Sequence, residues 1–119
     1  GRLNGPVVVL NMDRDDPGVA LQVATELRRA GLRAEAYMGS SGMRPQMKYA
    51  DRRGAPAVVM VGTDELAKGV VTIKDLKEGA KKAAAIQSNA EYREARPGQF
   101  EVARADMVAR LREIVEAEQ

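Results

Sequence analysis

Residues 57–76 read AVVMVGTDELAKGVVTIKDL, and this stretch decides the architecture of the chain. Residues 57–61 form a short continuous apolar run, which is typical of a strand buried on both faces. Residues 70–74 predict another strand with one face less buried, in which Val71 and Ile73 lie on one face and Thr72 and Lys74 on the other. The eight residues between the two runs are too few for a full helical crossover, so we expect these two strands to be antiparallel.

The pattern upstream of this stretch predicts a parallel sheet. Asp16 and Pro17 suit the start of a helix, Asp16 as a cap for its free amides and Pro17 as its first residue. Strand and helix patterns alternate over residues 6–12, 17–30, 32–37 and 43–53, ahead of the strand at 57–61. Such a βαβαβ order requires parallel strands joined by right-handed crossovers.

Downstream, Asp75 and Glu78 fit a capping box at the start of a further helix, which we expect to run to about Arg96. Residues 99–102 predict a short edge strand. An amphipathic stripe then indicates a helix that docks on the sheet, and it consists of Met107, Val108, Leu111, Ile114 and Val115. We therefore expect one domain over residues 1–119, with a helical insertion at about 77–98.

Composition excludes several kinds of site. The chain has no cysteine and no histidine, which removes thiolate catalysis, disulfides, the commonest general base and the usual zinc ligands. No serine has a histidine partner, and no P-loop is present. Asp13, Asp15 and Asp16 leave open a receiver-type magnesium site, although helix capping is the favoured interpretation. We expect no catalytic residue and no metal site.

Targeting features are also missing from the sequence. No apolar run is long enough to span a bilayer, and no signal peptide is visible. A cytoplasmic location fits the lack of cysteine. The chain does not begin with Met, which indicates a fragment or a processed chain.

Charge is unevenly placed, although the formal net charge is only +2. Arg44, Lys48, Arg52 and Arg53 stand against Asp51 in the second predicted helix. Such a patch suits a modest contact with nucleic-acid phosphates, for which Arg44, Arg52 and Arg53 are the candidates. A solvated helix face is the alternative interpretation.

Base recognition by this chain would have to be polar. Three tyrosines and one phenylalanine are too few for the stacking arrays of general single-strand binders. Glu65 and Lys74 offer a hydrogen-bond acceptor and a cationic donor, which we expect near one end of neighbouring elements. From spacing alone, a surface ion pair between them is the simpler interpretation.

Three strings in the chain resemble one protein family. QMKYAD at residues 46–51, GTDE at 62–65 and GVVTIKDL at 69–76 are similar to the anticodon-binding domain at the C-terminus of class II aminoacyl-tRNA synthetases, most closely the histidyl enzymes. The threonyl, prolyl and glycyl enzymes share this domain. The resemblance covers the chain except roughly residues 77–98, where the insertion resembles a bacterial subgroup.

This resemblance implies a fold and a binding role. The fold is a three-layer α/β domain with a five-stranded mixed sheet and flanking helices, which docks the anticodon stem-loop of histidine tRNA. By position in the family, Glu65 after the third strand and Lys74 on the fourth meet anticodon bases. Thr72, Gln46 and Lys48 are weaker candidates for anticodon contacts.

The resemblance also implies a larger enzyme. Histidine–tRNA ligation with ATP and Mg²⁺ would belong to a separate catalytic domain of the same chain, in a homodimeric cytoplasmic parent enzyme. The present domain would itself be non-catalytic. The alternatives are a synthetase-like module reused for protein interaction or regulation, the anticodon-binding domain of a threonyl, prolyl or glycyl enzyme, and a small-molecule or receiver-type α/β domain.

Overall fold

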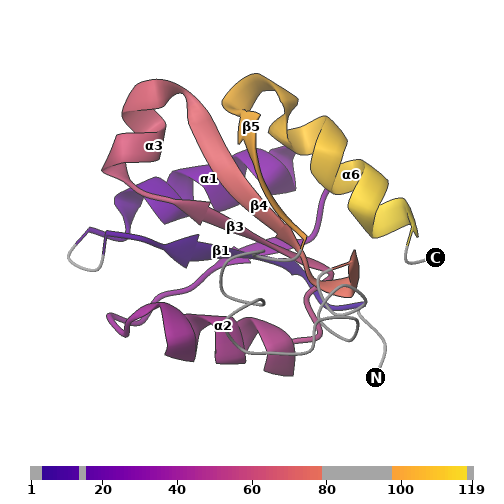
Figure 1. Cartoon of the computed structure of the whole chain (residues 1–119), viewed down its shortest axis with the longest axis horizontal. Helices are drawn as coiled ribbons and strands as arrows, with labels where there is room; N and C mark the ends of the chain where they lie inside the picture. The colour runs from indigo at the N-terminus through magenta and orange to yellow at the C-terminus, as the bar shows by residue number, and fades with distance from the viewer. Residues whose placement is uncertain (1–3, 14–15, 79–97, 118–119) are drawn as a thin grey trace.

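The computed structural model describes residues 4–13, 16–78 and 98–117. Figure 1 shows how the helices and strands of this part of the chain are arranged. In chain order the elements are β1 (Val7–Asn11), α1 (Gly18–Arg29), β2 (Ala34–Ala36), α2 (Met43–Arg52), β3 (Ala57–Val61), α3 (Thr63–Lys68), β4 (Val70–Asp75), β5 (Gln99–Ala103), the 3₁₀ turn η1 (Arg104–Asp106) and α6 (Met107–Ala117).

The five strands form one mixed sheet in the order β2-β1-β3-β4-β5. β1 pairs in parallel with β2 and with β3, whereas β4 is antiparallel to both of its neighbours. The direction changes where the sequence predicted it. The link between β3 and β4 folds as the short helix α3, and Gly69 ends that helix at a φ of 72°. This left-handed conformation suits glycine and turns the chain back along β3.

Helices cover both faces of the sheet, which confirms the predicted three-layer fold (Figure 1). On one face, α1 and α6 bury apolar residues of alternating strand positions, such as Val9, Val59 and Ile73. On the other face, α2 packs over the intervening positions, which include Leu10 and Val58. This division follows from the two-residue period of a strand, which sends successive side chains to opposite faces.

Local signals at the helix starts are confirmed in part. The Asp16 carboxylate accepts a hydrogen bond from Gly18 N at 2.9 Å. The helix begins at Gly18, so the expectation that Pro17 is its first residue was wrong by one position. Pro17 instead supplies the carbonyl that accepts from Leu21 N at 3.0 Å, which is the role of an N-cap residue.

Only one half of the predicted capping box after β4 is present, because the backbone N of Asp75 donates to the carbonyl of Gly98 at 2.9 Å and not to the Glu78 side chain. The Asp75 carboxylate accepts from Glu78 N at 3.0 Å, and residues 76–78 are helical. The rest of the expected helix to Arg96, and nearly all of the expected insertion at 77–98, lie outside the described residues. Beyond them, β5 is the predicted edge strand and α6 the predicted amphipathic helix, with Met107, Leu111 and Ile114 buried.

The edge strand β2 is only three residues long. Its register pairs Ala34 with Val7 and Ala36 with Val9 of β1. Arg28 in the last turn of α1 donates from Nε to the carbonyl of Ala34 at 2.8 Å. The side chain of a helix residue therefore occupies a hydrogen-bonding group at this edge of the sheet.

None of the helices in the described ranges has the length and apolar character that a bilayer crossing requires.

Candidate nucleic-acid interface

Gln46 fastens the first turns of α2 to the end of β1. Its Oε1 accepts from the backbone N of Asn11 at 2.7 Å, and its Nε2 donates to the carbonyls of Asn11 and Ser41, each at 2.9 Å. The last backbone bond between β1 and the β2 segment runs from Tyr37 N to Val9 O at 2.9 Å. The Gln46 amide thus replaces the peptide group that a longer β2 would offer to Asn11.

This geometry argues against the predicted tRNA contact of Gln46. The residue is 1% exposed, and both hydrogens of Nε2 have backbone acceptors. A nucleobase could reach the amide only by breaking these bonds. The structure thus gives Gln46 the role of positioning α2, and its anticodon contact stays a prediction that this geometry disfavours.

A second contact ties α2 to β2. Glu35 Oε1 accepts from the Tyr49 hydroxyl at 2.7 Å and from Arg53 Nε at 2.8 Å. The hydrogen bond from Arg53 lowers the pKa of the Glu35 carboxyl, and the bond to Glu35 raises the pKa of the Tyr49 hydroxyl. Tyr37 packs edge-on against Tyr49, with ring centroids 5.4 Å apart. Arg53, predicted to contact phosphate, is thus held by a carboxylate, which weakens its attraction for a second anion.

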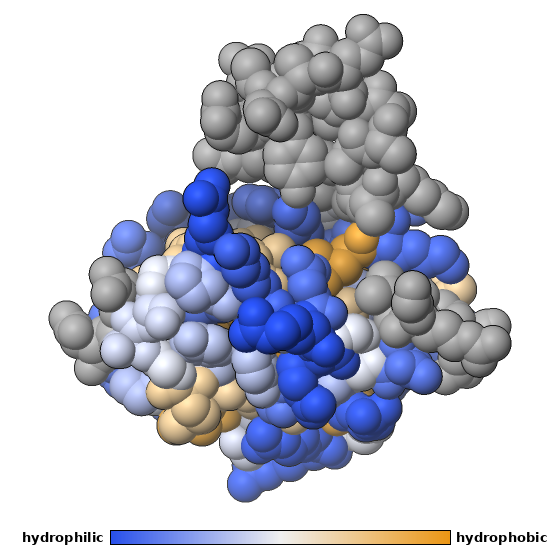
Figure 2. All heavy atoms as spheres, turned by 90° about the horizontal axis from the view of Figure 1, so that it is seen from below, coloured by the Kyte–Doolittle hydropathy of each residue, from blue (hydrophilic) through white to orange (hydrophobic). Residues whose placement is uncertain are grey.

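The remaining cations of α2 form a stripe. Arg44, Lys48 and Arg52 are all exposed, and their spacing of four residues places them on one side of the helix. Hydrophilic residues dominate the described surface on the α2 side of the molecule (Figure 2). We call these three residues the α2 cationic stripe. It keeps three of the four predicted basic residues together and leaves out Arg53.

Glu65 lies where β1 and β3 end. Its Oε1 is 3.1 Å from the point at which a β-carbon on Gly62 would sit, and the Met12 Cβ is 2.9 Å from the same point. Met12 is 45% exposed. Asn11, just before it, has a buried Nδ2 with no hydrogen-bond partner in the described part of the chain. Loops after parallel strands commonly carry ligand contacts in α/β sheets.

Lys74 and Thr72 lie on the face of β4 that points away from α1 and α6. Lys74 is paired in register with Val58, and Thr72 with Met60. Lys74 is therefore level with the start of β3, whereas Glu65 belongs to the helix that follows its end. Four residues of strand separate the two levels, or about 13 Å. The expectation that Glu65 and Lys74 lie near one end of neighbouring elements was wrong.

The sequence interpretation missed two residues beside Lys74 and Thr72. In the register of β4 and β5, Thr72 is opposite Glu101, and Lys74 is opposite Gln99. Glu101 is exposed, and the other three are partly buried. We call these four residues the β4–β5 polar face. The alternation in QFEVA could have revealed it, because Phe100 and Val102 pack toward the core.

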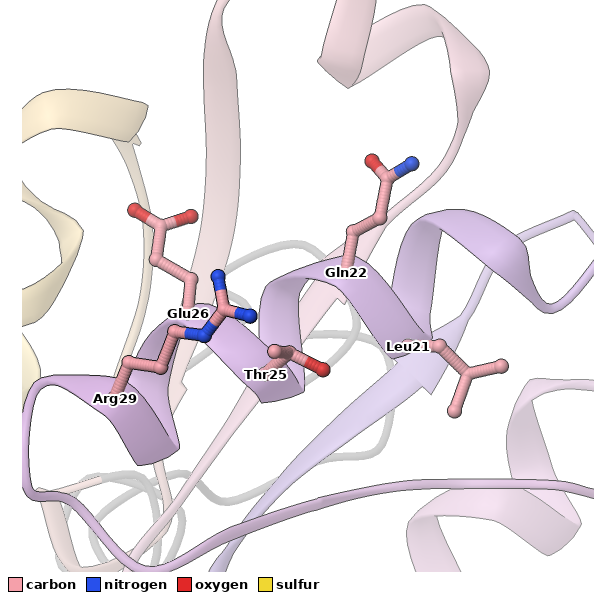
Figure 3. A pocket seen from close by; sticks show the side chains of 5 residues that line it. All are labelled: Leu21, Gln22, Thr25, Glu26 and Arg29. Carbon is pink, nitrogen blue, oxygen red and sulfur yellow. The ribbon is translucent and has the colours of Figure 1, made fainter.

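A shallow hollow on α1 lies on the other side of the sheet. Its volume is about 420 Å³. Figure 3 shows that all the side chains lining it project from α1, and they are Leu21, Gln22, Thr25, Glu26 and Arg29. No second element supplies a labelled side chain to it, so it does not form part of the interface described above.

Within residues 4–13, 16–78 and 98–117, no three carboxylates are grouped closely enough to hold a metal ion.

Comparison with known proteins identifies relatives that match nearly the whole chain. A family model described as "Anticodon binding domain" matches residues 6–114. The chain is 51% identical over 115 residues to the histidine–tRNA ligase of Caulobacter vibrioides, covering 97% of this chain and 23% of that protein. It is 54% identical over 112 residues to the ligase of Bradyrhizobium diazoefficiens, covering 93% and 22%. It therefore spans less than a quarter of the length of these relatives.

A solved structure has the same fold. The histidyl-tRNA synthetase from Nostoc sp. PCC 7120 matches with a TM-score of 0.68 at 27% sequence identity. The match covers 92% of this chain and 21% of that chain.

Proposed function

The chain belongs to the anticodon-binding domain family, and we propose that it is the part of a histidine–tRNA ligase that recognises the anticodon of histidine tRNA. One observation carries the proposal: about half of the residues are identical to those of histidine–tRNA ligases over nearly the whole chain. The fold and the polar surface around α2 and β4 supply the means of binding.

The rest of the activity belongs to the larger enzyme in this proposal. A catalytic domain of the same chain would join histidine to its tRNA with ATP and Mg²⁺, in a cytoplasmic homodimer. The domain described here would contribute tRNA binding and no chemical step. Its residues suit that role, since it has neither histidine nor cysteine.

We assign the RNA contacts to three groups of side chains. The α2 cationic stripe, Arg44, Lys48 and Arg52, contacts phosphates, which positions the RNA without reading its sequence. Glu65, at the ends of β1 and β3, accepts hydrogen bonds from a base. Lys74, with Thr72, donates to another. A separation of about 13 Å between the two reading positions exceeds one stacking step between bases, so we assign them to different nucleotides.

Binding of anticodon stem-loops to the 119-residue chain tests the proposal. We expect weak, salt-dependent binding of the histidine-tRNA stem-loop, and weaker binding when the anticodon is scrambled. Glu65→Ala and Lys74→Ala should weaken cognate binding more than scrambled binding. Lys68→Ala, which removes an exposed lysine from α3, is a control for charge and should affect both RNAs alike.

Two results would count against this function. Absence of binding at any salt concentration would reject RNA recognition by this chain. Equal losses on both RNAs would show that Glu65 and Lys74 contact the backbone and do not read bases.

A further inference from the structure

We propose that Glu101 on β5 is a base-contact residue, and that with Lys74 it selects an unpaired guanine; this rests on the proposed function. Glu65 and Lys74 were inferred from the family resemblance of the sequence, whereas Glu101 comes from the sheet register alone. Glu101 offers a base a hydrogen-bond acceptor on the same face as Lys74, whereas Glu65 lies about 13 Å away along the strand direction.

The register places the required groups on one surface. Thr72 is directly opposite Glu101, and Lys74 directly opposite Gln99, so Lys74 and Glu101 are diagonal neighbours. Directly opposed side chains have Cβ atoms about 4.5–5.5 Å apart, and diagonal neighbours are about 7–8 Å apart. Both are long side chains, so one planar base can touch the two heads together.

The same alternation keeps this surface polar. The residues between them, such as Ile73 and Phe100, pack into the core formed with α1 and α6. On the opposite side, α2 packs over side chains of β1 and β3, including Leu10 and Met60. The β4–β5 polar face continues the sheet beyond that contact, and Glu101 on it is exposed to solvent.

Glu101 has no evident part in holding the described elements together. The ion pairs recorded for these residues use Glu35, Glu26 and Glu113 instead. A carboxylate on a surface that binds RNA repels phosphates, so it favours binding only where it accepts hydrogen bonds from a base.

Guanine is the base that fits this pair of side chains. Its Watson–Crick edge carries two adjacent donors, the N1 hydrogen and the 2-amino group, which one carboxylate can accept together. Its O6 beside them accepts from a lysine ammonium. No other standard base presents a carbonyl next to two such donors.

A pair of matched variants tests the inference by the sign of the effect. Glu101→Gln and Glu113→Gln each remove one negative charge, from β5 and from the opposite layer on α6. If only long-range charge matters, both variants bind RNA slightly more tightly. We expect Glu113→Gln to behave so, and Glu101→Gln to bind the cognate stem-loop about tenfold more weakly without losing affinity for the scrambled one.

Inosine isolates the donor. It lacks the 2-amino group of guanine and keeps N1–H and O6. Replacing guanine by inosine at each anticodon position should weaken wild-type binding several-fold at one position. The same replacement should cause little further loss of affinity in the Glu101→Gln variant. Glu101→Asp keeps the charge and shortens the side chain, so its loss of affinity on inosine replacement should lie between those of wild type and Glu101→Gln.

The outcomes separate this inference from the proposed function. If wild type prefers the cognate RNA but Glu101→Gln binds it as tightly as Glu113→Gln does, the inference alone is overturned. Equal weakening on cognate and scrambled RNA also overturns it, because the contact would not read a base. Absence of any binding by wild type overturns both.

Discussion

Replacing Gln46 by alanine separates a positioning role from an RNA contact. The variant deletes the side-chain amide that accepts from Asn11 N and donates to Asn11 O and Ser41 O. Each buried backbone group left without a partner costs about 1–3 kcal/mol. The two groups of Asn11 therefore set a range of about 2–6 kcal/mol. Water entering the space left by truncation offsets part of this, so we expect a loss of about 2–4 kcal/mol.

Urea denaturation followed by circular dichroism measures this loss directly. A loss of that size is a large part of the stability of a small domain, which is about 5–15 kcal/mol. The control is Gln22→Ala on the exposed side of α1, which should change stability by less than about 0.5 kcal/mol. A Gln46→Ala protein that keeps its stability to within about 1 kcal/mol but loses RNA affinity would refute the reasoning and restore Gln46 as a base contact.

Four further substitutions probe the packing around α2 and its proposed phosphate contacts. Glu35→Gln should lower the free energy of unfolding by about 1 kcal/mol at neutral pH. The folded-state pKa of Glu35 is lowered, so its stabilising contribution is present above the unfolded-state pKa and is lost as pH falls through the folded-state pKa. The difference from wild type should therefore shrink in acid; denaturation at several pH values checks this, and a pH-independent difference would contradict it. Gly5→Ala should destabilise the domain by more than about 2 kcal/mol, measured by thermal melting, because a β-carbon there would lie 1.9 Å from the carbonyl oxygen of Arg53; an unchanged melting temperature would contradict this. Arg44→Ala and Lys48→Ala should each reduce the slope of log affinity against log salt by roughly 0.7–0.9, in titrations of the stem-loop, and an unchanged slope would exclude a phosphate contact.

The fold was predictable because the features that determine it are local patterns in the sequence. The continuous apolar run of β3 and the short link after it settled both the burial of that strand and the reversal of β4. The period of two within β4 correctly assigned Val71 and Ile73 to the core. Such patterns are visible without knowledge of any partner element.

The arrangement of the candidate site was less predictable, because it depends on register and on competition for partners. Glu65 and Lys74 are nine positions apart in the sequence, but the antiparallel return of β4 carries Lys74 away from the end of β3. The family string contains Gln46 but does not indicate that the end of β1 lacks a strand partner on its β2 side. In the sequence, Arg53 and Arg52 are equivalent basic residues, but in the fold Arg53 pairs with Glu35 from β2. Each of these outcomes needed a neighbour from another part of the chain.

The short β2 edge has a consequence for association between chains. An exposed sheet edge with free peptide groups is a template on which a strand of another molecule can dock. Here the edge offers three residues, and the Arg28 side chain already occupies the Ala34 carbonyl. An incoming strand would have to displace that arginine and would gain few bonds in return. This edge of the sheet is therefore a poor template for an added strand, even at high protein concentration.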